Sequence, residues 1–105
     1  MDLGLKGRTA LVCGASSGLG LAIARELARE GANVALVARR ESELTTQCKR
    51  IADEYGVKAL PVPADLSQPD AAGRVAAAVR DTFGAIDICV ANAGGPPSTV
   101  FESTT

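Results

Sequence analysis

The stretch Cys13-Gly14-Ala15-Ser16-Ser17-Gly18-Leu19-Gly20 decides the fold of this chain. It follows an apolar run, Thr9 to Cys13, which is typical of a strand buried on both faces of a sheet. Glycines allow a tight turn and a close approach of the backbone to a ligand, and the free N–H groups at a helix start attract an anion. The stretch therefore predicts a strand, a phosphate-binding turn and a helix; a turn with only a structural role is the alternative.

Beyond this turn, short apolar runs alternate with longer segments of helical periodicity. Apolar residues recur at helical spacing in three segments, which end at Gly31, Gly56 and Gly84. Ser67 and Asp70 resemble a capping box at the start of the third segment. The other apolar runs are expected to form strands at 9–13, 34–38, 57–62 and 86–91. Two prolines weaken the third of these. A Gly/Pro/Ser-rich stretch at 94–99 is expected to form a loop.

This alternation predicts an α/β fold, a Rossmann-type doubly wound parallel sheet of strand order 3-2-1-4, in a single domain over residues 1–105. Right-handed crossovers put the first two helices on one face and leave the third alone on the other. Ligands of such sheets bind at the carboxyl ends of the strands, here in the crevice between the first and fourth. We expect part of the second face to be bare and the strand at 86–91 to be an unpaired apolar edge, and both features favour association.

The composition is that of an ordinary globular protein and argues against several kinds of site. The 105 residues carry a net charge of −1 with interspersed charges, which does not suit a nucleic-acid or anionic membrane surface. Three widely spaced cysteines and no histidine argue against a zinc site, a disulfide framework and a histidine-activated nucleophile. The apolar runs are too short to span a bilayer and the first residues lack a secretory pattern, so we expect a cytoplasmic protein with reduced thiols.

Three motifs together resemble those of the short-chain dehydrogenase/reductase family. Gly14, Gly18 and Gly20 have the Gly-x3-Gly-x-Gly spacing of the family signature, Asp65-Leu66 follows the third strand, and Ala91-Asn92-Ala93-Gly94 follows the fourth. Cys13 and Ala91 stand where the family usually has Thr and Asn, which affects only local hydrogen bonding. The resemblance covers almost the whole chain and implies the cofactor-binding half of an oxidoreductase.

The end of the second strand bears on the choice of cofactor. An enzyme of this build that uses NAD places an acidic residue there to bond the ribose 2′-hydroxyl. Here Ala38 is followed by Arg39 and Arg40, whose guanidinium groups suit the 2′-phosphate of NADP(H), and no carboxylate is expected nearby. The alternative is that one or both arginines are a solvated helix start. The position of Ser17 often holds a basic residue in family members that prefer NADP, although the Ser17 hydroxyl is still able to hydrogen-bond the phosphate.

The resemblance implies further contacts with the cofactor. Asp65 is expected at the adenine ring, or alternatively as a cap of the next helix, and Asn92 is expected to tie neighbouring strands together, or alternatively to be an ordinary turn residue. The full predicted set is Gly14, Ser16, Ser17, Gly18, Leu19, Gly20, Arg39, Arg40, Asp65, Leu66, Asn92, Ala93 and Gly94.

The family's catalytic residues, in contrast, are absent from the sequence. The resemblance implies a Tyr-x3-Lys pair with an upstream Ser, but the only tyrosine, Tyr55, is followed at that spacing by Ala59 and belongs to an apolar helical stripe. We therefore expect a truncated NADP(H)-dependent reductase of a ketone or aldehyde, inactive alone and homo-oligomeric in full-length form. The residues at 2–7 and 94–97 resemble those of 3-oxoacyl-acyl-carrier-protein reductases. A non-catalytic nucleotide-binding module or partner subunit is the alternative.

Overall fold

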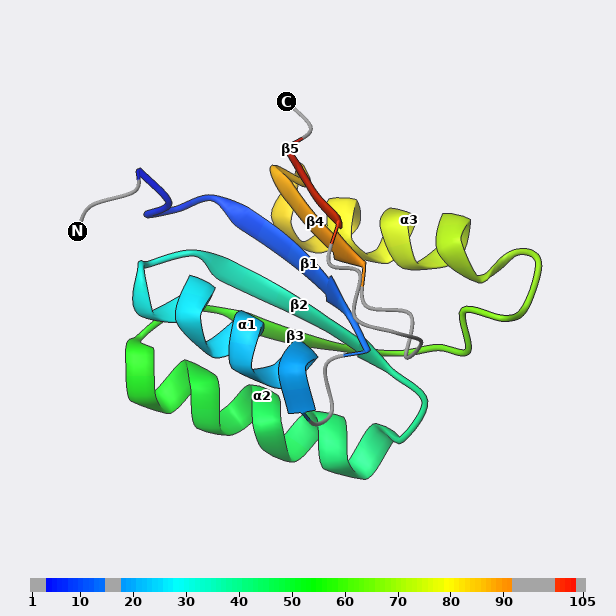
Figure 1. Cartoon of the computed structure of the whole chain (residues 1–105), viewed down its shortest axis with the longest axis horizontal. Helices are drawn as coiled ribbons and strands as arrows, with labels where there is room; N and C mark the ends of the chain where they lie inside the picture. Colours follow the sequence, from blue (N-terminus) through cyan, green and yellow to red (C-terminus); the bar gives the residue numbers. More distant parts are fainter. Residues whose placement is uncertain (1–3, 15–17, 92–99, 104–105) are drawn as a thin grey trace.

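The computed structural model describes residues 4–14, 18–91 and 100–103, the last of these by backbone alone. Strands and helices alternate until a final pair of strands (Figure 1). Their order along the chain is β1 (Thr9–Cys13), α1 (Gly18–Arg29), β2 (Asn33–Ala38), α2 (Glu41–Tyr55), β3 (Ala59–Pro63), α3 (Ala71–Phe83), β4 (Ile88–Ala91) and β5 (Val100–Ser103).

The strands form one sheet of order β3-β2-β1-β4-β5. The first four are parallel, which confirms the predicted order 3-2-1-4 and the Rossmann-type fold. The expectation that β4 is an unpaired edge is wrong, because β5 pairs with it antiparallel from Ile88↔Ser103 to Ala91↔Val100. An antiparallel partner needs no crossover helix, so β5 is able to pair with β4 although it follows closely in the chain. The Gly/Pro/Ser-rich composition before β5 gave no signal of this strand.

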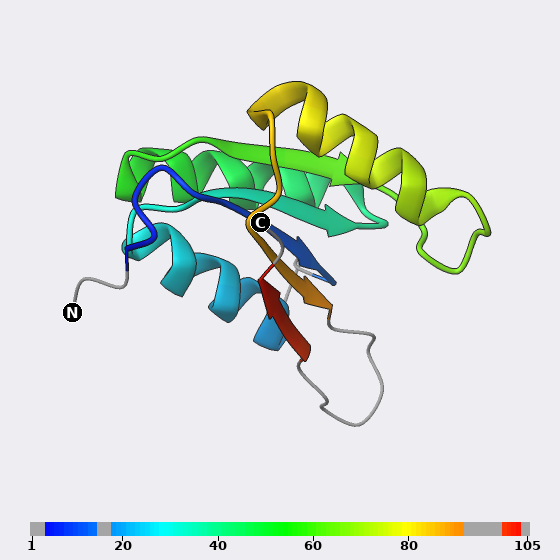
Figure 2. The ribbon, with the colours of Figure 1, turned by 90° about the horizontal axis from the view of Figure 1, so that it is seen from above.

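The helices cover the two faces of the sheet as the crossover rule predicts. Alternate strand residues such as Val12 and Leu36 pack with α1 and α2, whereas Leu11 and Val37 pack with α3 on the other face (Figure 2). In the described part of the chain this face is only partly bare, since Leu11 and Val37 are 6% and 1% exposed whereas Leu60 and Cys89 are half-buried. The large apolar side chains that are exposed there belong to Leu19 and Leu66, which lie outside the sheet.

The prolines of β3 are compatible with its place at the edge of the sheet. The Ala64 N–H, just after the strand, donates to the Ala38 carbonyl at 2.9 Å. Because N–H directions alternate along a strand, Pro61 and Pro63 occupy positions whose N–H would point away from β2. The two prolines therefore remove donors only from the open edge, where unpaired donors favour association with other chains.

The start of α3 differs from the predicted capping box. The helix begins at Ala71 with Asp70 at its N-cap and no side-chain cap hydrogen bond. The Ser67 hydroxyl instead donates to the Asp65 carboxylate at 2.6 Å. The capping-box prediction is wrong because Ser67 has a carboxylate acceptor two residues before it and stands four residues before the helix.

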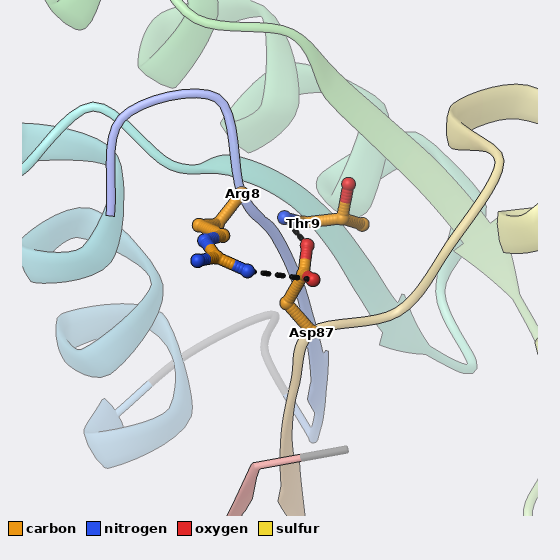
Figure 3. A network of polar contacts seen from close by, with 3 residues as sticks. All are labelled: Arg8, Thr9 and Asp87. Atoms are coloured by element: carbon orange, nitrogen blue, oxygen red, sulfur yellow. Dashed lines mark hydrogen bonds and ion pairs between the residues drawn. The ribbon is translucent and has the colours of Figure 1, made fainter. Parts of the chain in front are cut away.

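Asp87 joins β4 to β1 at the amino end of the sheet (Figure 3). Its carboxylate accepts the Thr9 N–H at 2.8 Å and lies 3.4 Å from the Arg8 guanidinium. Its own N–H donates to the Thr9 carbonyl at 2.9 Å. These bonds fix the register of the two strands at whose other ends the ligand crevice is predicted.

Removing the Asp87 carboxylate should destabilise the protein measurably. Asp87→Ala leaves the N–H of the buried Thr9 without its acceptor, which costs about 1–3 kcal/mol of the free energy of unfolding. Arg8→Ala, which removes only a largely exposed ion pair, should cost about 0–1 kcal/mol. Urea unfolding of both variants measures the difference. Equal losses in the two variants would show that the backbone contact contributes little.

Candidate functional site

The carboxyl ends of β1, β2, β3 and β4 lie along one edge of the sheet, and α1 and α2 begin there (Figure 1). This edge carries the described members of the predicted site on four separate segments. Gly14 follows β1, Arg39 follows β2, and Asp65 lies two residues after β3. Five predicted residues lie outside the described part of the chain: Ser16, Ser17, Asn92, Ala93 and Gly94.

The glycine-rich turn has room for a ligand at the start of α1. Gly18 opens the helix with φ +63°, and a Cβ built on it meets nothing within 4 Å. The first turn of α1 contains no acidic residue, so the partial positive charge of the helix start is not offset by its own side chains. Gly20 is buried inside the helix. This segment is suited to an anion held by backbone N–H groups.

Gly14 has a different role from the other two glycines. It adopts φ +69°, a conformation that favours glycine, immediately after β1. Its N–H donates to the Val37 carbonyl of β2 at 2.8 Å and is therefore already satisfied. Gly14 sets the direction of the turn, and the anion-binding donors must come from later residues.

Arg39 and Arg40 are both exposed, and neither forms an ion pair with another described residue. Arg40 is the N-cap residue of α2 and makes no side-chain cap hydrogen bond. The expectation that no carboxylate lies nearby is wrong. Glu41 and Glu43 occupy the first turn of α2, where the helix dipole favours acidic residues, and Asp65 lies close enough for Arg39 to affect its pKa.

Asp65 is held in a turn rather than at a helix start. Its Oδ1 accepts the Ser67 hydroxyl at 2.6 Å and the Ser67 N–H at 3.0 Å. These two bonds, and more weakly the Arg39 guanidinium, lower the pKa of the Asp65 carboxyl. The alternative interpretation of Asp65 as a cap of α3 does not hold, since the helix begins only at Ala71.

The two exposed leucines belong to the predicted set. Leu66 is 43% exposed beside Asp65, and Leu19 is 47% exposed in the first turn of α1. The Leu19 side chain lines a groove along α1 together with Leu5 and Ile23. Apolar side chains exposed at this edge are compatible with contact to the flat rings of a nucleotide.

The sequence pattern indicated no role for Asp87 and the wrong one for Ser67. A signal existed for Asp87, because Arg8 immediately precedes the strand predicted at 9–13, Asp87 lies at the start of the strand predicted at 86–91, and the two strands were predicted to be neighbours. No comparable signal identified Ser67, since its acceptor depends on the path of the chain after β3.

Among the described residues, neither a reactive thiol nor a group of metal ligands forms an alternative catalytic centre. Burial raises the pKa of both the Cys13 and the Cys48 thiols to about 11, with a further contribution from Cys89 at Cys13, so both are protonated at neutral pH. Tyr55 packs against the core at the far end of α2, with Arg25 5.8 Å from its ring centre. No group of three potential metal ligands occurs among the described residues. None of the helices in this same part of the chain is long and apolar enough to span a membrane.

The fold and this edge define an α/β protein with a glycine-rich segment at the carboxyl end of β1. Residues 8–105 match the family of short chain dehydrogenases, and the chain belongs to that family. A short chain dehydrogenase of Pseudocercospora fijiensis is 44% identical over 90 residues, which cover 86% of this chain and 29% of that protein. The chain spans about a third of the length of the curated relatives it matches.

Solved structures show the same relationship. The L-sorbose reductase of Gluconobacter frateurii, complexed with NADPH and L-sorbose, is 41% identical with a TM-score of 0.87 over 92% of this chain and 37% of its own. An NAD⁺-bound xylitol dehydrogenase is 30% identical with a TM-score of 0.76 over 81% of this chain and 32% of its own. Relatives that resemble this chain in structure thus include proteins solved with either nicotinamide cofactor.

Proposed function

We propose that this chain is the NADP(H)-binding part of an oxidoreductase that reduces a ketone or an aldehyde, with residues 1–105 as one dinucleotide-binding domain. The observation that carries the proposal is Arg39, which is exposed one residue after β2 and pairs with no described carboxylate. A guanidinium in this place is a donor for a 2′-phosphate, whereas a ribose 2′-hydroxyl would need an acceptor.

The described residues fit such a cofactor. The open space at Gly18 and the start of α1 would accept the pyrophosphate. Arg39 and Arg40 would hold the 2′-phosphate, and Asp65 and Leu66 would contact the adenine. The bound nicotinamide would supply the hydride. The proposed set is completed by Ser16, Ser17, Asn92, Ala93 and Gly94.

The class of substrate rests on the family and on named relatives. A reductase of L-sorbose, which is a ketose, and a dehydrogenase of xylitol are both similar to this chain. They support a small carbonyl compound or alcohol as the substrate. A 3-oxoacyl thioester is a narrower proposal that rests only on the residues at 2–7 and 94–97. Homo-oligomerisation and a cytoplasmic location remain predictions.

The cofactor proposal is tested by comparing the dissociation constants of NADPH and NADH. The protein should bind NADPH more tightly, and Arg39→Ala should reduce that preference about tenfold to a hundredfold, because a charge-assisted bond contributes about 1.5–3 kcal/mol. Nicotinamide fluorescence gives both constants, and NADH binding should change little in the variant.

Arg50→Ala is the matched control for this measurement. Arg50 is also an exposed arginine of the α2 segment, but it lies toward the other end of that helix. Its removal changes the net charge by the same amount and should leave the preference unaltered. Equal affinities of the unmutated protein for the two cofactors would refute the proposed choice of NADP(H).

A further inference from the structure

Arg39 and Asp65 lie next to each other at the carboxyl edge of the sheet. β2 and β3 end as a pair at Ala38 and Pro63, and the Ala64 N–H closes the ladder on the Ala38 carbonyl. Arg39 is the first residue after β2, and Asp65 is the second residue after β3. An exposed guanidinium and a half-buried carboxylate thus lie just beyond adjacent strand ends, where an ion pair between them would be expected.

The structure shows a different partner for the carboxylate. Asp65 Oδ1 accepts two hydrogen bonds from Ser67, at 2.6 Å from the hydroxyl and 3.0 Å from the backbone N–H. Arg39 forms no ion pair with Asp65 or with any other described residue. Of the influences on the Asp65 carboxyl, both bonds from Ser67 exceed that of Arg39.

We propose that Ser67 is a positioning residue for cofactor selectivity, because it holds the Asp65 carboxylate and leaves the Arg39 guanidinium available to a 2′-phosphate. This inference rests on the proposed NADP(H) function. A carboxylate paired with Arg39 would both occupy its donors and repel the phosphate dianion. The hydroxyl of Ser67 is the part of this arrangement that a substitution removes without altering either charged residue.

The ratio of the NADH to the NADPH dissociation constant separates this role from a general structural one. Both cofactors carry the same adenine, so a displaced Asp65 would weaken both equally if it contacts only the ring. Only NADPH has the 2′-phosphate, so competition for Arg39 lowers the ratio. Exposed ion pairs are weak, and the expected fall in Ser67→Ala is about two- to fivefold.

Two further variants complete the binding experiment. Ser67→Thr retains a hydroxyl and should retain the ratio of the unmutated protein. Adding Asp65→Asn to Ser67→Ala removes the competing charge and should bring the ratio back to at least its original value. A ratio unchanged in Ser67→Ala, or not restored in the double variant, would overturn the proposal.

A second readout does not require any cofactor. NMR titration of the Asp65 carboxyl reports which group stabilises its charged form. Arg39→Gln should hardly change the pKa of Asp65 in the unmutated background, but should raise it clearly in the Ser67→Ala background, where the carboxylate is free to pair with Arg39. The same small response in both backgrounds would overturn the role of Ser67. If the titration behaves as expected while NADPH and NADH bind equally, the proposed cofactor choice fails and the positioning by Ser67 stands.

Discussion

Gly18→Val should reduce NADPH binding by more than about a hundredfold, since the side chain would fill the space left for the pyrophosphate and displace at least two charge-assisted hydrogen bonds. A Cβ at Gly18 meets no atom of the protein within 4 Å, so the space is open to a ligand. Valine at φ +63° is also strained by about 1–3 kcal/mol, which would shift the start of α1. Fluorescence titration with NADPH measures the loss.

Gly56→Val is the control that separates strain from obstruction. Gly56 has φ +69° and the same open surroundings as Gly18, but it follows the far end of α2, away from the proposed site. The two variants should lose similar stability in urea, whereas only Gly18→Val should lose binding. Equal NADPH affinity in the two variants would mean that Gly18 is only a turn residue.

Gly20→Val should also abolish NADPH binding. Because Gly20 is buried, the added side chain should also lower the free energy of unfolding by about 1–3 kcal/mol.

The strands of the sheet were predictable because a buried strand leaves a local apolar pattern in the sequence. Strands such as β1 and β2 are buried on both faces, so they appear in the sequence as uninterrupted apolar runs. The glycines that end α2 and α3 also have clear local causes: each adopts positive φ and donates its N–H to the last helical turn. Chain order and right-handed crossovers then leave few arrangements of the strands.

The errors concern contacts that depend on where separate segments meet. The sequence Val100–Ser103 contains only one short mixed run, and its strand state comes from pairing with β4. Ser67 has two carboxylates within three residues, and local spacing favoured Asp70 although the structure selects Asp65. Asp65 lies near Arg39 because β2 pairs with β3. No local pattern of charges in the sequence predicts that proximity.

The carboxylates near Arg39 affect what the site predicts about the choice between NADPH and NADH. Arg39 alone favours a phosphate, but the Asp65 carboxylate lies close enough to interact with it, and Glu41 and Glu43 follow it in the first turn of α2. Under the proposed function, a preference for NADPH would depend on how many of those carboxylates are held away from the guanidinium. Of the three, Asp65 has hydrogen-bond partners that do so, and the glutamates sit where the α2 dipole stabilises their charge.

The chain of residues 1–105 should show no dehydrogenase activity, even where it binds NADPH. Reduction of a carbonyl needs a proton donor at the oxygen as hydride arrives, and a positioned general acid contributes about 10²–10⁴-fold. The sequence has no histidine and no Tyr-x3-Lys pair. Tyr55 lies at the end of α2 opposite to Arg40, and the thiols of Cys13 and Cys48, with pKa values near 11, are poor acids at neutral pH.

The test follows NADPH absorbance with a ketone, an aldehyde and a 3-oxoacyl thioester, beside a binding titration of the same preparation. NADPH binding without oxidation is the expected result for either of two proteins, a non-catalytic nucleotide-binding module or the binding part of a reductase. The reading frame after Thr105 distinguishes them, because only the reductase requires a Tyr-x3-Lys segment there. Turnover of any of the three substrates by residues 1–105 would show that a proton donor outside the family's catalytic pair operates at the crevice between β1 and β4.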